Sequence, residues 1–365
     1  MYFLELGGED DAFAALEARS AATAVTLLAP GVATAGTISP ERVRGLAYTR
    51  RASELLGRTD ADLESARALL NAASIDRAGT VAVRVTDVKG STGVDTARAE
   101  RVLGQVLVDR GFEVDLDEPD HVLRAAFGAG EVAADAAAVL DPSDEPTADG
   151  PVDRSSVCAL GWQVAESVRD FGDRKPTAKP FFQPGSMDPL LARAVANVAG
   201  ARPGATVLDP MCGTGGVLVE AGLVGADVVG TDAQSKMVRG ARENLVHFLG
   251  GEGGPPERVA ERPGPATPGS FDVVRADATA LPLADGAVDG VVFDAPYGRQ
   301  SKIETHDLED LVAGALAESR RVADRAVIVA DRSWAGRARA AGWTIEASVE
   351  RRVHRSLTRY VLVLA

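Results

Sequence analysis

Cysteine and histidine are scarce in this chain of 365 residues. The two cysteines, Cys158 and Cys212, are too few for a disulfide framework or a cysteine-based metal cluster. The four histidines show no metal-ligand spacing either, so we predict no bound metal. No apolar run approaches the ~20 residues that a membrane helix needs. Met1-Tyr2-Phe3 begins no basic signal region, and we therefore expect a cytoplasmic protein.

Positive charge is also scarce. The chain has 39 basic against 53 acidic residues, a net charge of −14, and only five of the basic residues are lysine. A nucleic-acid-binding protein usually carries a basic surface, so this balance argues against such a partner. However, dispersed acid with few lysines is typical of halophilic proteins, and in very high salt the Debye length falls to about 3 Å. The charge therefore weakens the case for a nucleic-acid partner without excluding it.

The first third of the chain predicts a small α+β unit. Apolar alternation indicates strands at 2–6, 24–28, 81–85 and 113–116, and helical periodicity indicates helices at 10–18, 53–73 and 96–110. Residues 121–127 and 131–140, which Gly128-Ala129-Gly130 separates, are expected to form a hairpin, although the alanine-rich second arm could instead be a helix. We predict an N-terminal region over 1–140, a linker over 141–180 and a second domain over 181–365.

The second domain alternates strands and helices, which is typical of a doubly wound α/β fold. A strand ending at Asp209 is followed by a turn with Gly213, Gly215 and Gly216 and then by a helix. Glycines allow the backbone to approach a ligand closely. The turn lacks both the dinucleotide G-x-G-x-x-G pattern and the Lys-Ser/Thr of a P-loop. It suits a cofactor with an amino-acid moiety, whose ammonium can pair with Asp209; S-adenosylmethionine is such a cofactor.

Three further strands are each expected to end in an acid. Asp232 follows the glycine turn by roughly 20 residues, the spacing for binding ribose hydroxyls, and Asp277 is placed to accept a hydrogen bond from the adenine amine. One such acid would be unremarkable, but four in one sheet predict a methyltransferase. The predicted cofactor-binding residues are Asp209, Gly213, Thr214, Gly215, Asp232, Asp277 and Ala278.

The fourth acid begins the stretch Asp294-Ala295-Pro296-Tyr297, which predicts methyl transfer to an exocyclic base amine. Such an amine is weakly nucleophilic because the ring delocalises its lone pair. Asp294 and the Ala295 carbonyl can accept its two hydrogens and leave the lone pair directed at an electrophile. Tyr297 can stack on the base, and Pro296 stiffens the turn. These four residues are the predicted catalytic set.

Two further segments have two interpretations each. Arg174-Lys175-Pro176 and the following Phe181-Phe182 either contact phosphates and a stacked ring or form a rigid linker whose phenylalanines cover a core. The loop from Arg299 to Lys302 contacts RNA phosphates or is solvated. We take Phe182, Arg299 and Lys302 as the candidate substrate-binding residues.

From about residue 170 to the end, the chain resembles the archaeal tRNA guanine-10 N2-methyltransferases. The resemblance is carried by residues 174–187, by Asp209–Gly216 and by Asp294–Arg299; residues 81–111 resemble a THUMP domain more loosely. It implies a Rossmann-like S-adenosylmethionine-dependent domain that methylates N2 of guanine 10 once and then twice. It also implies a THUMP-type region that grips the tRNA acceptor end, and it suggests a small methyltransferase activator protein as a second partner. The family's motif reads Asp-Pro-Pro-Tyr, and Ala295 replaces its first proline.

Other functions fit some of the same motifs. An rRNA guanine-N2 or DNA amino-methyltransferase would share the C-terminal motifs but needs no THUMP-like region. A non-catalytic THUMP RNA-binding protein is disfavoured, because all four acids and the glycine turn are present.

Overall fold

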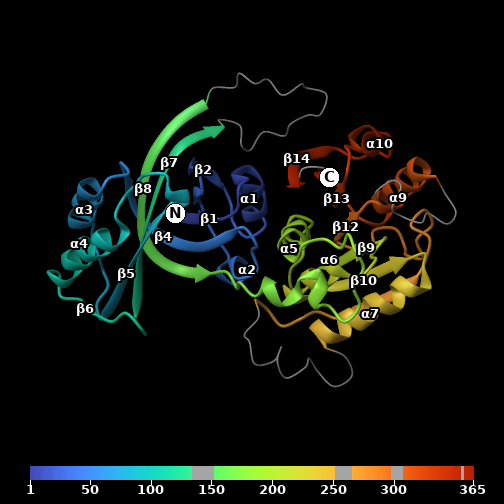
Figure 1. Cartoon of the computed structure of the whole chain (residues 1–365), viewed down its shortest axis with the longest axis horizontal. Helices are drawn as coiled ribbons and strands as arrows, with labels where there is room; N and C mark the ends of the chain where they lie inside the picture. Colours follow the sequence, from blue (N-terminus) through green and yellow to red (C-terminus); the bar gives the residue numbers. More distant parts are fainter. Residues whose placement is uncertain (134–151, 251–264, 297–306, 355–356) are drawn as a thin grey trace. The chain divides into compact units, whose positions relative to one another are not determined.

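A computed structural model describes residues 1–133, 152–250, 265–296, 307–354 and 357–365. The chain divides into two compact units (Figure 1). Of the described residues, the first unit contains 1–133 and 152–167, and the second contains those from Val168 to Ala365. Within the described ranges, no helix is long and apolar enough to cross a membrane.

The first unit is built on an eight-stranded sheet with the strand order β2-β3-β1-β4-β8-β7-β5-β6. Strand β5 runs parallel to β6 and β7, and the other neighbours are antiparallel. The strands are β1 (Tyr2–Leu6), β2 (Thr26–Ala29), β3 (Val32–Ala35), β4 (Thr49–Thr59), β5 (Thr80–Asp87), β6 (Glu113–Val114), β7 (His121–Ala133) and β8 (Val152–Glu166). The helices are α1 (Asp11–Ala18), α2 (Pro40–Val43), α3 (Leu63–Ala72) and α4 (Thr96–Val108), with a 3₁₀ turn η1 (Val88–Gly90).

This sheet curls strongly, as the long curved β4, β7 and β8 show in Figure 1. Strand β2 lies against β7 although four strands separate them in the sheet. The curve encloses one core around Phe3, Val32 and Ala126. Helices α3 and α4 cover a second core around Leu103 and Trp162.

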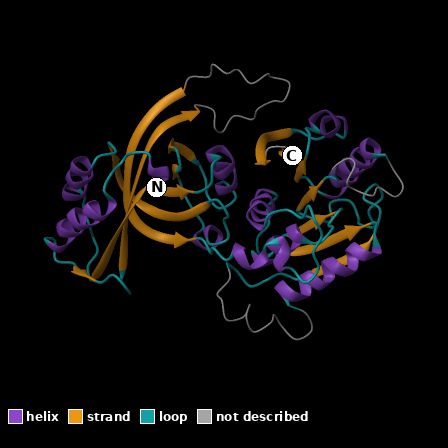
Figure 2. Cartoon of the chain, viewed as in Figure 1, coloured by secondary structure: helices purple, strands orange, loops and turns teal. Residues whose placement is uncertain are grey.

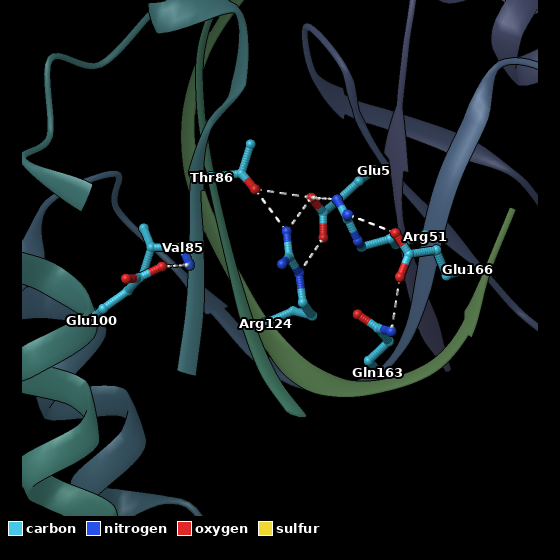
Figure 3. A network of polar contacts seen from close by, with 8 residues as sticks. All are labelled: Glu5, Arg51, Val85, Thr86, Glu100, Arg124, Gln163 and Glu166. Atoms are coloured by element: carbon cyan, nitrogen blue, oxygen red, sulfur yellow. Dashed lines mark hydrogen bonds and ion pairs between the residues drawn. The ribbon is translucent and has the colours of Figure 1, made fainter. Parts of the chain in front are cut away.

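A buried ionic network crosses the curled sheet (Figure 3). Arg124 on β7 donates two 2.7 Å hydrogen bonds to the carboxylate of Glu5 on β1. Thr86 on β5 donates to Glu5 at 3.1 Å and accepts from Arg124 at 2.7 Å. Glu5 is 3% exposed and Arg124 5%. Because a buried charge is tolerated only when it is paired and hydrogen-bonded, this network fixes β1, β5 and β7 relative to one another.

Three predictions for this unit are wrong. The helix expected over 53–73 is the strand β4 followed by α3, which starts where Asp62 caps it by accepting a 2.9 Å hydrogen bond from the Ser65 N–H. No hairpin forms around Gly128–Gly130, because these residues lie within the single continuous strand β7. The linker expected over 141–180 includes Val152–Glu166, which is β8, the antiparallel partner of both β4 and β7.

The two glycines of β7 serve close packing rather than a turn. A Cβ at Gly128 would lie 3.1 Å from Val32, and one at Gly130 would lie 3.0 Å from Pro30. The curl of the sheet thus brings β2 and β3 onto β7 at the positions that lack a side chain.

The second unit contains a seven-stranded sheet with the order β11-β10-β9-β12-β13-β15-β14. The first five strands are parallel, and β15 is antiparallel to both β13 and β14. This is the predicted Rossmann-like methyltransferase arrangement. The strands are β9 (Thr206–Asp209), β10 (Asp227–Asp232), β11 (Phe271–Arg275), β12 (Gly290–Asp294), β13 (Ala326–Ala330), β14 (Ile345–His354) and β15 (Leu357–Leu364).

Helices cover both faces of this sheet (Figure 2). Helices α5 (Pro189–Val198), α6 (Gly216–Leu223) and α7 (Ser235–Leu249) pack together on one face. Helices α9 (Leu308–Val322) and α10 (Ala335–Ala340) bury the other face around Phe293, Ile328 and Leu362. The strands β9, β10 and β12 end at Asp209, Asp232 and Asp294, which confirms three of the four predicted strand ends.

A buried cluster of charges anchors the segment that enters this unit. Arg174 lies in the 3₁₀ turn η2 (Phe171–Arg174), shortly before η3 (Pro176–Ala178). Glu220 on α6 pairs with Arg174 at 2.6 Å and with Arg193 on α5 at 2.7 Å. Burial opposes the charge of Arg174, but Glu220 and Asp170 hold its pKa above the usual value. The pairs fix residues 170–180 against α5 and α6, next to the glycine turn.

Candidate active site

The glycine turn begins where β9 ends. Asp209 closes the strand, and its carboxylate accepts a 3.0 Å hydrogen bond from the Met211 N–H. Gly213 and Gly215 adopt positive φ angles of 51° and 74°, which glycine alone adopts without strain, and Gly215 caps α6. A Cβ at Gly213 would meet no atom within 4 Å. The backbone is therefore exposed to open space at Gly213, as ligand binding requires.

The end of β10 holds the turn in place. The carboxylate of Asp232 accepts hydrogen bonds from the N–H groups of Gly213, at 3.1 Å, and Gln234, at 2.8 Å. Next to it, the Thr231 hydroxyl donates to the Pro210 carbonyl at 2.8 Å, and the Thr231 carbonyl accepts from the Cys212 N–H at 2.8 Å. The turn is thus preformed by its hydrogen bonds to the neighbouring strand.

Three acids from neighbouring strands converge at this edge of the sheet. Asp209 is 3% exposed, and burial raises the pKa of its carboxyl well above the usual range. The Met211 N–H lowers that pKa, while the carboxylates of Asp232 and Asp294 raise it further. Burial and the carboxylates of Asp209 and Asp232 also raise the pKa of the Cys212 thiol. The concentration of negative charge favours a cationic ligand group.

Asp209, Asp232 and Asp294 are not arranged as the ligands of a metal ion. In the part of the chain that the structure describes, no three histidine, cysteine or carboxylate side chains are placed to hold a metal ion.

Asp294 lies at the carboxyl end of β12, beside Val329 of β13 in the sheet register. Its side chain is 22% exposed, whereas Ala295 is buried. The Ala295 N–H donates a 2.7 Å hydrogen bond to the Val329 carbonyl. A further charge, the guanidinium of Arg359 on β15, lies 3.7 Å from the Asp294 carboxylate. Asp294 is therefore held on a rigid strand end and remains accessible.

Asp277 does not end its strand as predicted. Strand β11 stops at Arg275, and Asp277 lies in the turn that follows. Its carboxylate accepts hydrogen bonds from the N–H and the hydroxyl of Thr279, at 2.9 and 2.8 Å. These bonds close a local turn that competes with continued strand pairing. The next residue, Ala278, is buried in the hydrophobic core beneath α9.

Thr214, also predicted to bind the cofactor, is connected to two other elements. Its carbonyl accepts a 2.8 Å hydrogen bond from Asn244 on α7, and its hydroxyl lies 3.2 Å from that of Ser186. Asn244 also exchanges two 2.9 Å hydrogen bonds with the backbone of Phe181. This fully buried amide therefore connects the segment before the sheet to the glycine turn.

The two phenylalanines of that segment lie in different environments. The Phe181 ring packs against α7, where a Cβ on Gly240 would lie 2.0 Å from it, so Phe181 covers a core. Phe182 is 42% exposed and stays a candidate for substrate contact. The other predicted contacts, Tyr297, Arg299 and Lys302, lie outside the described residues.

Sequence reasoning missed Asn244 and Arg359. A signal existed for each. Asn244 is a polar residue on the apolar face of α7, between Ala241 and Phe248. Arg359 shares one face of β15 with the apolar Val361 and Val363. A polar residue on an otherwise apolar face predicts a buried partner, but it does not identify that partner.

Known proteins match this chain over both units. Residues 176–252, which include the glycine turn and α7, match the model of a family described as the RMKL-like methyltransferase domain. The tRNA (guanine(10)-N2)-dimethyltransferase of Methanothermobacter thermautotrophicus is 32% identical over 329 residues, which are 87% of this chain and 83% of that protein. The chain belongs to the tRNA (guanine(10)-N2)-dimethyltransferase family.

A second member of this family, from Pyrococcus abyssi, is 26% identical over 78% of this chain and 74% of its own length. Among solved structures, TrmN from Thermus thermophilus aligns with 100% of this chain and 99% of its own at 21% identity, with a TM-score of 0.43. The strand order of the second unit identifies its Rossmann-like fold.

Proposed function

We propose that this chain is a tRNA methyltransferase that transfers methyl groups from S-adenosylmethionine to the exocyclic N2 of guanine 10, first once and then twice. One observation carries the proposal: Asp209, Asp232 and Asp294 converge around a preformed glycine turn in a member of this family. The relatives' names, which specify dimethyltransferases acting at guanine 10, support the position and the number of transfers.

The glycine turn and the first two acids fit S-adenosylmethionine. Asp209, buried beside two other carboxylates, would pair with the ammonium of the amino-acid moiety. Each Asp232 oxygen accepts one backbone hydrogen bond, and a carboxylate oxygen has a second lone pair for a ribose hydroxyl. Gly213 offers open backbone, and Asp277 would accept from the adenine amine. When bound, the cofactor supplies an electrophilic methyl group.

Asp294 and Ala295 would act on the target base. The guanine leaves its stack at a cost of a few kcal/mol, and Tyr297 is the predicted stacking partner. The Asp294 carboxylate and the Ala295 carbonyl accept the two N2 hydrogens and hold the lone pair toward the methyl group. The strand end on which Asp294 lies fixes this geometry, and Asp294 takes or relays the released proton.

The first unit would hold the tRNA. It is a separate compact unit, and the similarity to the Methanothermobacter relative extends into it, since 87% of the chain is covered. We therefore assign it the predicted THUMP-type role at the acceptor end. The requirement for a small activator protein also stays a prediction. Methyl transfer by the isolated chain would contradict it.

The test compares methyl acceptors. Labelled S-adenosylmethionine is supplied with unmodified tRNA transcript, rRNA or duplex DNA in multimolar KCl, since the charge of −14 suggests a halophilic protein, and the product nucleosides are mapped. We expect N2-methyl- and N2,N2-dimethylguanosine at position 10 of tRNA. Label only on rRNA or DNA would contradict the tRNA assignment, and cofactor binding without transfer would indicate a missing activator or a binding protein.

A further inference from the structure

Arg359 places a positive charge beside Asp294. Its Nη2 lies 3.7 Å from Asp294 Oδ2, and its side chain is only 6% exposed. That separation is longer than a hydrogen bond, so this contact acts through charge rather than by occupying the carboxylate at bonding distance. An arginine stays protonated at any physiological pH. The charge beside Asp294 is therefore permanent.

The sheet register explains why the two residues meet. Asp294 lies beside Val329, and Val329 lies beside Val361 on β15. Residues directly opposite one another share a face of the sheet, and so do residues two apart on a strand; Asp294 and Arg359 are therefore on the same face. Tyr360 pairs with Ala330, the last residue of β13. Arg359 thus lies one residue beyond the carboxyl end of β13, and its side chain reaches across that end to β12.

This position has an electrostatic consequence. Asp294 lies close enough to Asp209 on β9 that its charge affects the Asp209 carboxyl, as does the charge of Asp232 on β10. Like charges at close range disfavour ionisation and push side chains apart. A fixed guanidinium on the opposite side of Asp294 offsets that repulsion. The strand β15, whose antiparallel direction brings Arg359 to this edge, thus contributes to the site.

We propose that Arg359 is a positioning residue for Asp294: its charge holds the carboxylate directed toward the target amine. The proposal rests on the role of Asp294 in the proposed function. As the bond between N2 and the methyl carbon forms and the sulfur–carbon bond breaks, N2 loses one proton. An ionised, fixed Asp294 can accept that proton or relay it to water.

The first test replaces the charge and keeps the polarity. Arg359→Gln is expected to lower kcat about 10- to 100-fold, with KM for tRNA and the calorimetric Kd for S-adenosylmethionine within about threefold of wild type. Arg359→Lys, which retains a charge on a different stem, is expected to give an intermediate kcat. Arg325→Gln is the control: Arg325 pairs with Glu346 at 2.9 Å at the other end of β13 and is expected to leave kcat unchanged.

The second test asks whether Arg359 acts through Asp294. Adding Arg359→Gln to Asp294→Asn is expected to lower kcat by less than about twofold further, because the group that Arg359 positions is already lost. A wild-type kcat in Arg359→Gln, or a full additional 10-fold loss in the double variant, would overturn the proposal. Wild-type activity of Asp294→Asn would instead refute the role of Asp294. If Arg359→Gln does not fold, Arg359→Lys decides: kcat should fall at least about threefold with cofactor binding intact, and a wild-type value would overturn the proposal.

Discussion

The main-chain N–H of Ala295 donates a hydrogen bond of 2.7 Å to the carbonyl of Val329. The bond extends the pairing of β12 and β13 one residue beyond Asp294. A proline at position 295, which the Asp-Pro-Pro-Tyr motif would place there, has no N–H and cannot donate this hydrogen bond. In this chain the backbone hydrogen bond to β13, rather than a proline ring, therefore restricts the conformation of Ala295.

Ala295→Pro should consequently destabilise the second unit. The substitution leaves the carbonyl of the fully buried Val329 without this donor, and we expect the free energy of unfolding to fall by about 1–3 kcal/mol in a denaturant titration. Ala295→Gly keeps the N–H and is the control, with an expected loss of about 1 kcal/mol or less. Equal or greater stability of the proline variant would show that the bond contributes little.

Asp209→Asn should stabilise the cofactor-free protein at neutral pH. The folded-state pKa of Asp209 is raised above its usual 3.8, so the native state binds more protons than the unfolded state above pH 3.8, and its stability falls as pH rises through that window. Asparagine removes this penalty and keeps an oxygen for the Met211 N–H. We expect a Tm a few degrees above wild type at pH 7, as ~1 kcal/mol gives in a unit of this size.

The gain should disappear as the pH falls below 3.8, where wild-type Asp209 becomes protonated in the unfolded state as well as in the folded state. Cofactor affinity, measured by calorimetry, should fall in the same variant. Asp289→Asn is the control and should show no gain in Tm. Asp289 is an exposed carboxylate just before β12 that accepts a hydrogen bond from the N–H of Thr206, the first residue of β9. A lower Tm for Asp209→Asn than for the wild type at pH 7 would contradict the predicted cost of the buried Asp209 charge.

Asn244→Ala should weaken both the fold and cofactor binding. The substitution removes the partners of the Phe181 N–H, the Phe181 carbonyl and the Thr214 carbonyl, and we expect a loss of about 2–4 kcal/mol on unfolding. The glycine turn also loses its connection to residues 181–187. Calorimetry should therefore show roughly 10-fold weaker binding of S-adenosylmethionine. Glu243→Ala, at an exposed position on the same helix, should change neither quantity.

Glu5→Gln should destabilise the first unit. Removing the carboxylate leaves Arg124 buried with its charge uncompensated, at an expected cost of about 3–5 kcal/mol. Hydrogen exchange should report it as faster exchange of β1, β5 and β7 amides. The control is Glu54→Gln on the neighbouring β4, which breaks the exposed 2.8 Å pair between Glu54 and Arg77 and should cost under about 1 kcal/mol. Similar costs for the two variants would contradict a special role of the buried network.

The sequence predicted the second unit far better than the first. Short apolar runs that end at Asp209, Asp232 and Asp294 indicate parallel strands without knowledge of their partners. In the first unit the glycines of β7 resemble a turn, and only the close approach of Pro30 and Val32 shows why they are there. Arg359 meets Asp294 through the register of three strands, which no local pattern contains.

The central claim, that Asp294 orients the target amine, is tested most directly by single-turnover methyl transfer to unmodified tRNA transcript. Asp294→Ala should lower the rate by at least about 100-fold, with calorimetric affinity for S-adenosylmethionine within about threefold of wild type. Asp289→Ala, at the amino end of the same strand, should retain the wild-type rate. An unchanged single-turnover rate in Asp294→Ala would contradict the account.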